Sequence, residues 1–287
     1  MASTRSVGYH EGKVDTVISV EEVNRQAQKL GGGVKPERIE ALANDKPFVR
    51  IEGLSAGYGK MEILHDFHLA VARGQSLCLI GPNGAGKSTV LHSIFGFTRI
   101  FGGGITVGEG ARAKDITRLN SSQKLREAGI AYILQDKSVF PNMTVEENLW
   151  MGGYLLDTPA MAKARAEKVF AKYERLAARR KHPAKVLSGG ERRLLEISRA
   201  LVMEPEVLLV DEPSIGLEPR FIDMVFGILD DLQKKEGKTI IMVEQNAKRG
   251  LEFADLGYVL VTGQIAMADT GDALLQNPDV GRLFLGG

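Results

Sequence analysis

The strongest chemical signal in the sequence is a glycine-rich segment, residues 81–88, which reads GPNGAGKS. It matches the phosphate-binding pattern G-x-x-x-x-G-K-[ST], with an apolar strand-like run before it and a helix expected after it. Glycines let backbone N–H groups turn inward around phosphates, and the start of a helix adds the positive end of its dipole. The pattern predicts that Lys87 contacts the β- and γ-phosphates of a nucleotide and that Ser88 binds Mg²⁺. The residues expected to surround the phosphates are Gly81, Pro82, Asn83, Gly84, Ala85, Gly86, Lys87, Ser88 and Thr89.

A second signal is an acidic pair, Asp211 and Glu212, which directly follows the apolar run at residues 207–210. We expect Asp211 to hold the Mg²⁺ shell, and Glu212 to orient or deprotonate the attacking water. An acidic pair after a strand also occurs at ordinary helix starts. The interpretation therefore depends on the phosphate-binding segment earlier in the chain.

A third signal is the segment LSGGE at residues 187–191, a glycine-rich turn that opens a helix and so offers a second anion site. It resembles the signature of ABC ATPases, and it lies between the two nucleotide motifs, where that family has it. The resemblance implies ATP hydrolysis with Mg²⁺ by a dimer. In such a dimer, the signature of one subunit presses on the γ-phosphate held by the other. The signature residues concerned are Ser188, Gly189, Gly190 and Glu191.

Further positions take a role only through this resemblance. Tyr58 matches the aromatic residue that stacks on adenine, although a tyrosine packed in a turn is an alternative. Gln135 matches the glutamine that senses Mg²⁺ and the attacking water, which makes it both a metal and a catalytic candidate. Gln245 stands where most ABC ATPases have a histidine; it can hydrogen-bond a phosphate but cannot carry a positive charge. The expected catalytic residues are thus Lys87, Gln135, Glu212 and Gln245, and the expected metal ligands Ser88, Gln135 and Asp211.

Two longer strings narrow the resemblance: VEQN at residues 243–246 and FPNMTVEENL at residues 140–149. Both are similar to the second ATPase subunit of bacterial branched-chain amino acid importers, and the similarity spans about residues 48–287. It implies a subunit that powers uptake of branched-chain or related amino acids. The implied partners are transmembrane permease subunits, for which residues 140–149 line a groove, and a second ABC ATPase, with a heterodimer favoured over a homodimer. A periplasmic solute-binding protein is an indirect partner.

Other functions remain open at this point. Cassettes for urea and short amides are similar, and GGERR at residues 189–193 also resembles lipopolysaccharide-export cassettes, although those keep the histidine that Gln245 replaces. A soluble, non-transport ABC ATPase of translation or DNA repair would carry two cassettes or a long coiled-coil insertion. A P-loop kinase or GTPase would have no use for LSGGE, and the guanine-reading N-K-x-D is absent.

The elements that must position these residues alternate between strands and helices, which predicts an α/β fold. The resemblance implies that this fold is a P-loop NTPase (ABC ATPase) core. A helix-only stretch at about residues 143–187 predicts an inserted α-helical subdomain. A turn is expected at residues 57–59 and a hairpin around residues 262–263. The expected strands are 48–52, 64–71, 76–80, 128–134, 207–210, 239–243, 258–261 and 264–267, and the expected helices are 86–95, 144–156, 158–179, 191–203 and 220–235.

Composition sets the remaining limits. The 287 residues carry a net charge of +1, which gives no reason to expect a nucleic acid partner. The sequence shows neither an apolar stretch of membrane-spanning length nor a secretory signal. We therefore expect a cytoplasmic protein, held peripherally on the inner face of the cell membrane through its permease. Residues 1–47 are interpreted as a helical or partly disordered extension, with a capping box at residues 19–22, and residues 48–287 as the nucleotide-binding domain.

Overall fold

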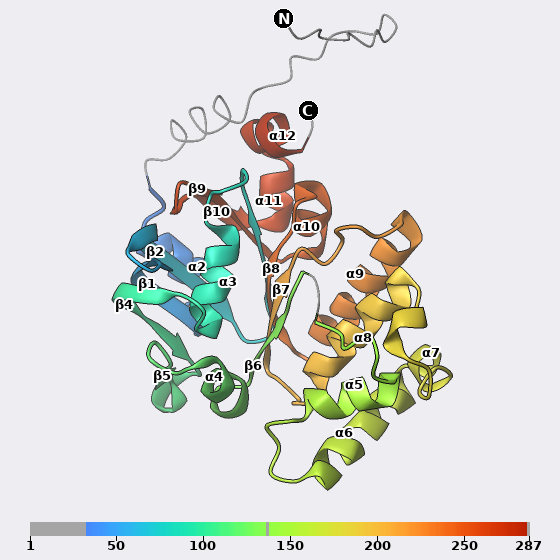
Figure 1. Ribbon diagram of the computed structural model, residues 1–287. Coiled ribbons are helices and arrows are strands. Elements are labelled where there is room, and N and C mark those ends of the chain that lie inside the picture. The colour runs from blue at the N-terminus through green and yellow to red at the C-terminus, as the bar shows by residue number, and fades with distance from the viewer. Residues whose placement is uncertain (1–32, 136–137, 286–287) are drawn as a thin grey trace, which may run out of the picture.

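The computed structural model describes residues 33–135 and 138–285 of the chain (Figure 1). The capping box expected at residues 19–22, and the helix expected after it, lie outside the described residues. The first described helix, α2 (Pro36–Leu42), packs against β2 and β10, and its Ile39 is buried in the same core as those strands. The division of the chain into an extension and a domain at residue 48 remains a prediction.

The centre of the fold is a six-stranded sheet with the strand order β10-β9-β3-β8-β7-β6. Five of the strands pair in parallel, and β10 runs antiparallel to β9 in the expected hairpin. β3, β7, β8 and β9 are buried along their whole length, as strands covered on both faces must be. The strands are β3 (Ser76–Ile80), β6 (Ile130–Ile133), β7 (Val207–Asp211), β8 (Thr239–Val243), β9 (Leu256–Val261) and β10 (Gln264–Thr270).

A second, antiparallel sheet has the order β2-β1-β4-β5 and lies beside the first. The turn predicted at residues 57–59 is placed too early in the chain. Gly57 and Tyr58 still belong to the strand, where they pair with Glu62 and Met61. Gly59, with φ +60°, provides the left-handed backbone that this tight connection needs. The strands are β1 (Pro47–Tyr58), β2 (Met61–Ala72), β4 (Arg99–Val107) and β5 (Lys114–Asp115).

Helices cover both faces of the central sheet. α3 packs between the two sheets, because Val90, Leu91 and Ile94 share one core with residues of β1, β2 and β3. α9 covers the opposite face over β7 and β8. The helices outside the lobe described next are α3 (Lys87–Phe95), α4 (Ser121–Glu127), α9 (Pro219–Lys234), α10 (Ala247–Phe253), α11 (Gly271–Leu275), α12 (Pro278–Phe284) and the 3₁₀ turn η1 (Gly110–Arg112).

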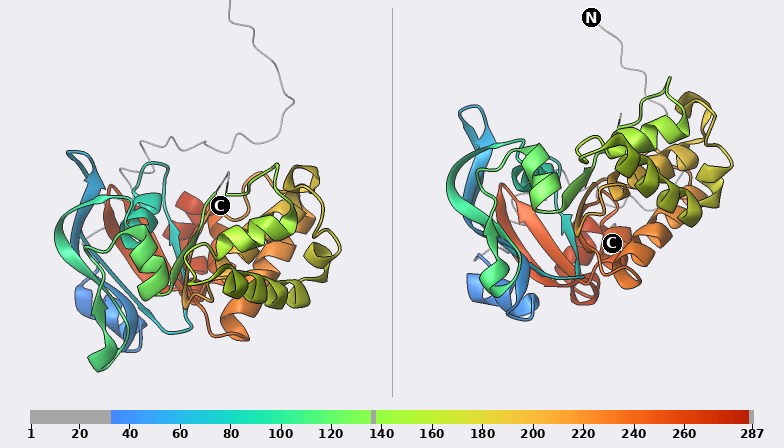
Figure 2. Two further views of the ribbon diagram at one scale, coloured as in Figure 1. Left: turned by 60° about the horizontal axis from the view of Figure 1, so that its bottom comes forward. Right: turned by 90° about the horizontal axis from the view of Figure 1, so that it is seen from below.

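Between β6 and β7 the described chain forms a helical lobe on one side of the sheets (Figure 2). It contains α5 (Val145–Gly152), α6 (Pro159–Lys172), α7 (Glu174–Ala177), the 3₁₀ turn η2 (Ala184–Val186) and α8 (Gly189–Leu201). The single helix expected over residues 158–179 is wrong. Tyr173 has φ −121° and ψ 82°, which ends α6 and starts α7 in a new direction, so that Leu176 is buried in the core of the lobe.

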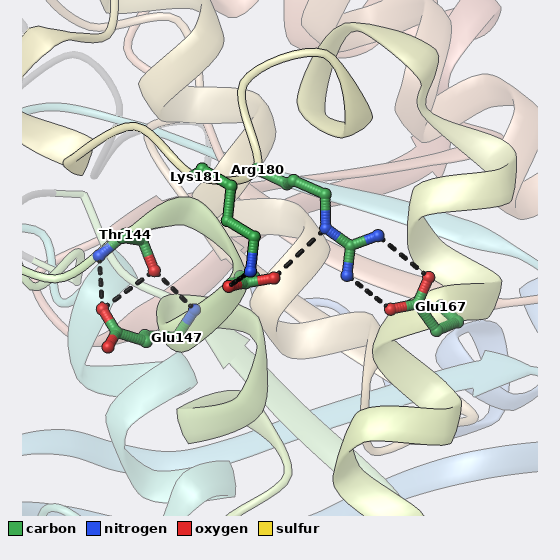
Figure 3. A network of polar contacts seen from close by, with 6 residues as sticks. Thr144, Glu147, Glu167, Arg180 and Lys181 are labelled. Atoms are coloured by element: carbon green, nitrogen blue, oxygen red, sulfur yellow. Dashed lines mark hydrogen bonds and ion pairs between the residues drawn. The ribbon is translucent and has the colours of Figure 1, made fainter.

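Polar contacts hold the start of the lobe in place (Figure 3). Thr144 and Glu147 form the expected capping box at the start of α5, which confirms that prediction. Glu146, which is buried, accepts hydrogen bonds from Arg180 and Lys181, and Arg180 also pairs with Glu167 on α6. The Lys181 and Arg180 bonds hold the pKa of Glu146 below its usual value.

Among the described helices, none combines the length and apolar character that crossing a membrane requires.

Candidate functional site

The phosphate loop and the expected catalytic residues meet where β3, β7 and β8 end. Parallel strands end at one edge of a sheet, and ligands bind in the crevice outside that edge. A cavity of about 560 Å³ opens there. Residues from the phosphate loop (residues 81–88) and from the loops after β6, β7 and β8 line it. Its lining residues are Ile63, Asn83, Gly84, Gly86, Lys87, Ser88, Thr89, Gln135, Glu212, Ile215 and Gln245.

The phosphate loop connects β3 to α3 in a shape that needs glycine. Gly81 has φ +145°, and a Cβ atom there would lie 2.2 Å from the carbonyl oxygen of Leu260. Lys87 folds back across the loop: its Nζ donates to the carbonyl oxygens of Gly81 at 2.8 Å and Pro82 at 3.0 Å. Burial lowers the pKa of Lys87, while the carboxylates of Asp211 and Glu212 favour its charged form. The loop thus holds a buried cation at the edge of the cavity.

Asp211, at the end of β7, is buried and has partners on both carboxylate oxygens. Ser88 donates to Oδ1 at 3.3 Å, and the hydroxyl of Tyr132 on β6 donates to Oδ2 at 2.7 Å. Burial and the nearby Asp211 charge raise the pKa of Tyr132, which keeps it a donor. A hydroxyl and a carboxylate this close fit Mg²⁺, which typically takes one or two protein oxygens and completes its shell with phosphates and water. No group of three or more His, Cys, Asp or Glu side chains among the described residues suits a metal held by protein alone.

Glu212 and Gln135 face each other across the cavity, and Gln135 donates through Nε2 to Glu212 Oε2 at 3.0 Å. Glu212 has φ 43°, a left-handed conformation that is strained for a residue with a side chain, and its N–H donates to Val243 O at 2.9 Å. Burial, and next the charge of Asp211, raise the pKa of Glu212 above the usual value for a carboxyl. A raised pKa makes this carboxylate a better proton acceptor.

The signature residues 188–191 lie apart from this cavity, and none of them lines it. Ser188 caps α8 and forms a reciprocal capping box with Glu191. Gly190 lies against α9, since a Cβ there would be 2.1 Å from Cδ1 of Phe221. One chain therefore presents a phosphate loop and a signature at separate places. That a second subunit supplies the missing half remains a prediction.

Tyr58 also lies outside the cavity lining. Its side chain is 43% exposed at the end of β1, its hydroxyl is paired with Nδ1 of His92 on α3, and the two rings meet edge to face. The adenine-stacking role of Tyr58 remains a prediction.

Other residues of the site were missed from the sequence. Arg193 on α8 is buried, and it donates to the carbonyl oxygens of Leu134 at 2.7 Å and Asp211 at 3.3 Å while pairing with Glu196 at 2.8 Å. It ties the signature helix to the ends of β6 and β7. Its only sequence signal is a charged residue on the apolar side of the expected helix 191–203. Ile63 and Tyr132 carried no signal, because apolar and aromatic strand residues look alike at this level.

Comparison with known proteins identifies the family. The family model described as "ABC transporter" matches residues 64–215, more than half of the chain. The chain belongs to this family. It is an ATP-binding subunit of the ABC transporter type, and ATP hydrolysis is the activity of the family.

Three curated relatives of this ABC subunit illustrate its similarities. It is 43% identical to the high-affinity branched-chain amino acid transport ATP-binding protein BraG of Pseudomonas aeruginosa, over 82% of this chain and 97% of that one. It is 37% identical to the probable branched-chain amino acid transport ATP-binding protein LivF of Archaeoglobus fulgidus, over 83% and 98%. It is 30% identical to the lipopolysaccharide export system ATP-binding protein LptB of Haemophilus influenzae, over 82% and 95%.

A solved structure confirms the P-loop NTPase fold of the ABC type. The crystal structure of a nucleotide-free ATP-binding cassette from an ABC transporter superimposes with a TM-score of 0.72 at 27% identity. The match covers 84% of this chain and all of that one.

Proposed function

We propose that this ABC subunit powers the uptake of branched-chain or chemically related amino acids. The observation that supports this most is the 43% identity to a branched-chain amino acid transport ATP-binding protein along nearly the whole of that relative. The lipopolysaccharide-export relative is more distant, at 30%. Gln245 favours the same choice, because export cassettes of that type keep a histidine at this position.

Within the site, we assign the steps of hydrolysis to named side chains. Lys87 and the phosphate loop bind the β- and γ-phosphates of ATP. Ser88, Asp211 and Gln135 would hold Mg²⁺, which would neutralise charge on the phosphates. Glu212 orients the attacking water and takes up its proton, helped by its raised pKa. Gln245 hydrogen-bonds the γ-phosphate, and Tyr58 stacks on adenine.

ABC subunits of transporters act together with transmembrane permeases. A groove of about 340 Å³ between the helical lobe and β6 supports such docking, because Phe140, Met151 and Tyr154 are 42%, 37% and 77% exposed along it. Exposed large apolar side chains gathered in one place mark binding surfaces. We infer that permease subunits hold this chain on the cytoplasmic face of the membrane and that a periplasmic solute-binding protein acts on it indirectly.

We further infer that the chain works in a heterodimer with a second ABC ATPase. Residues 188–191 lie away from the phosphate cavity of their own chain, so each complete site needs a signature from another subunit. The uncharged Gln245 makes a site that differs from one with a histidine. A homodimer is the alternative.

The test is transport by the reconstituted assembly. The chain, its permease subunits and its solute-binding protein would be placed in vesicles, and uptake of leucine, isoleucine and valine measured with and without ATP. We expect ATP-dependent uptake of at least one of them, and none with Glu212→Gln. Uptake of urea or acetamide without any of the three amino acids would contradict the proposal.

A further inference from the structure

The side chain of Glu244 is a buried carboxylate whose partners lie in two loops of the site. It follows β8, precedes Gln245 and is 1% exposed. Its Oε1 accepts hydrogen bonds from Ser214 Oγ at 2.8 Å and from Asn246 N at 2.9 Å, and its Oε2 lies 3.4 Å from Ser214 N. Within residues 33–135 and 138–285, no cationic side chain forms an ion pair with it. Three donors therefore offset the cost of burying this charge.

The aliphatic part of the Glu244 side chain is closely packed against α10. Gly250 on α10 lies directly against it: a Cβ on Gly250 would be 3.0 Å from Glu244 Cβ and 2.6 Å from Cys78 Sγ. Side chains locked by packing and hydrogen bonds hold their neighbours within a fraction of an ångström. Glu244 is thus a rigid point beside the nucleotide cavity.

The two loops that Glu244 joins both enter that cavity. Ser214 is followed by Ile215, and Glu244 by Gln245, and both Ile215 and Gln245 line the cavity together with Glu212. The backbone adds a parallel link, since Glu212 N donates to Val243 O at 2.9 Å. Asn246 in turn caps α10 by accepting from Arg249 N.

We propose that Glu244 is a positioning residue that ties the loop after β7 to the loop after β8 and so keeps Gln245 at the γ-phosphate. Neither Lys87 nor the phosphate loop is among the hydrogen-bond partners of Glu244, so we expect Glu244→Ala to keep most of the affinity for ATP. The inference rests on the role proposed above for Gln245, and it concerns the rate of hydrolysis. A misplacement of about 1 Å at a reacting centre costs up to about a hundredfold in rate.

The test measures ATP turnover by the full chain in its assembled transporter, for Glu244→Ala, Ser214→Ala and the double variant. We expect Glu244→Ala to lower kcat by about tenfold or more, while KM for ATP changes by less than about threefold. Ser214→Ala should lower kcat less, and the double variant should match Glu244→Ala, because both changes break one link. Glu244→Gln, which keeps an acceptor oxygen for Ser214 and Asn246, should restore most of the rate.

The matched control is Asp255→Ala. The Asp255 side chain also accepts three hydrogen bonds, from Ser76 N, Ser76 Oγ and Gln233 Nε2. Asp255 precedes β9 and contacts the start of β3, whereas the phosphate loop follows the end of β3. Its loss should leave kcat unchanged. Hydrogen exchange provides a second readout: in Glu244→Ala, amides at residues 214–216 and 246–249 should exchange faster together, and in Asp255→Ala they should not.

Several results would overturn the proposal. An unchanged kcat in folded Glu244→Ala would do so, as would fully additive losses in the double variant. If Glu244→Ala fails to fold, Ser214→Ala tests the proposal in its place. An unchanged kcat in Ser214→Ala would show that the hydrogen bond between Ser214 and Glu244 does not affect hydrolysis. Gln245→Ala, measured alongside, tests the role of Gln245 at the γ-phosphate separately from the positioning role of Glu244. Normal turnover in that variant overturns the role of Gln245, and a slow Glu244→Ala beside it would show that positioning acts through Ile215.

Discussion

The second glycine of the signature is required by packing. In the structure Gly190 faces Phe221, and a Cβ built on it would lie 2.1 Å from Cδ1 and 2.6 Å from two further ring carbons. Carbon atoms in contact prefer about 3.5–4.0 Å, so the ring would have to move by more than 1 Å. Gly189 is a matched neighbour, since its Cβ would meet only Leu217 Cδ2, at 3.7 Å.

These distances give opposite expectations for two alanine substitutions. Overpacking of this kind costs about 1–3 kcal/mol, and replacing a helical glycine by alanine returns at most about 1 kcal/mol. Gly190→Ala should therefore lower the free energy of unfolding by up to about 2 kcal/mol, and leave it below that of Gly189→Ala. Gly189→Ala should leave it unchanged or raise it slightly.

The assay is urea unfolding of the full chain, followed by circular dichroism. The double variant Gly190→Ala/Phe221→Leu identifies the cause, because a smaller side chain at 221 leaves room for the methyl group and should recover part of the loss. Equal stability of Gly190→Ala and Gly189→Ala would refute the packing argument. A double variant that loses the sum of both single losses would refute the assignment to Phe221.

Three further predictions follow from the site and the core. With Glu212→Gln, light scattering should show a monomer or weak dimer without nucleotide and a tight dimer with MgATP; a tight dimer in both conditions would argue against an ATP-bridged pair. In a purified heterodimer, Glu212→Gln in this chain should slow turnover less than the equivalent change in a partner that has a histidine at the Gln245 position, because a charge-assisted hydrogen bond is about twice as strong as a neutral one; equal losses would refute this asymmetry. Burial lowers the pKa of Lys124 to about 8. Below that pH the charged lysine is buried in the folded state and lowers the free energy of unfolding. This loss of stability becomes smaller as the pH rises toward about 10.4, the pKa of lysine in the unfolded chain. The difference in melting temperature between wild type and Lys124→Met should therefore change in favour of wild type from pH 7 to pH 10, and a constant difference would contradict it.

The parts of the site that depend on local chemistry could be predicted from the sequence. The phosphate loop, the strand before it and the helix after it follow from glycines and apolar runs within about 20 residues, and the structure has β3 and α3 at those positions. The parallel strands β7 and β8 could also be predicted from the sequence, because a buried strand needs an unbroken apolar run.

The parts that depend on distant contacts could not be predicted. β4 contains Gly102, Gly103 and Gly104, which have the composition of a loop, yet it pairs with β1 along its length. Gly103 is needed there because its Cβ would lie 2.3 Å from Gly53 O, a contact that exists only in the folded sheet. Glu244 is a similar case, because one acidic residue beside Gln245 looks exposed in sequence, and only the approach of Ser214 from the loop after β7 makes a buried carboxylate tolerable.

The central claim is that Glu212 acts on the water while Lys87 holds the phosphates, and one pair of variants tests it most directly. ATP binding and ATP turnover would be measured for Glu212→Gln and Lys87→Ala in the assembled transporter. We predict that Glu212→Gln binds ATP normally and hydrolyses it about a thousandfold more slowly, since it loses the water-orienting base. Lys87→Ala should lose affinity for ATP. Near-normal turnover in Glu212→Gln would contradict the account.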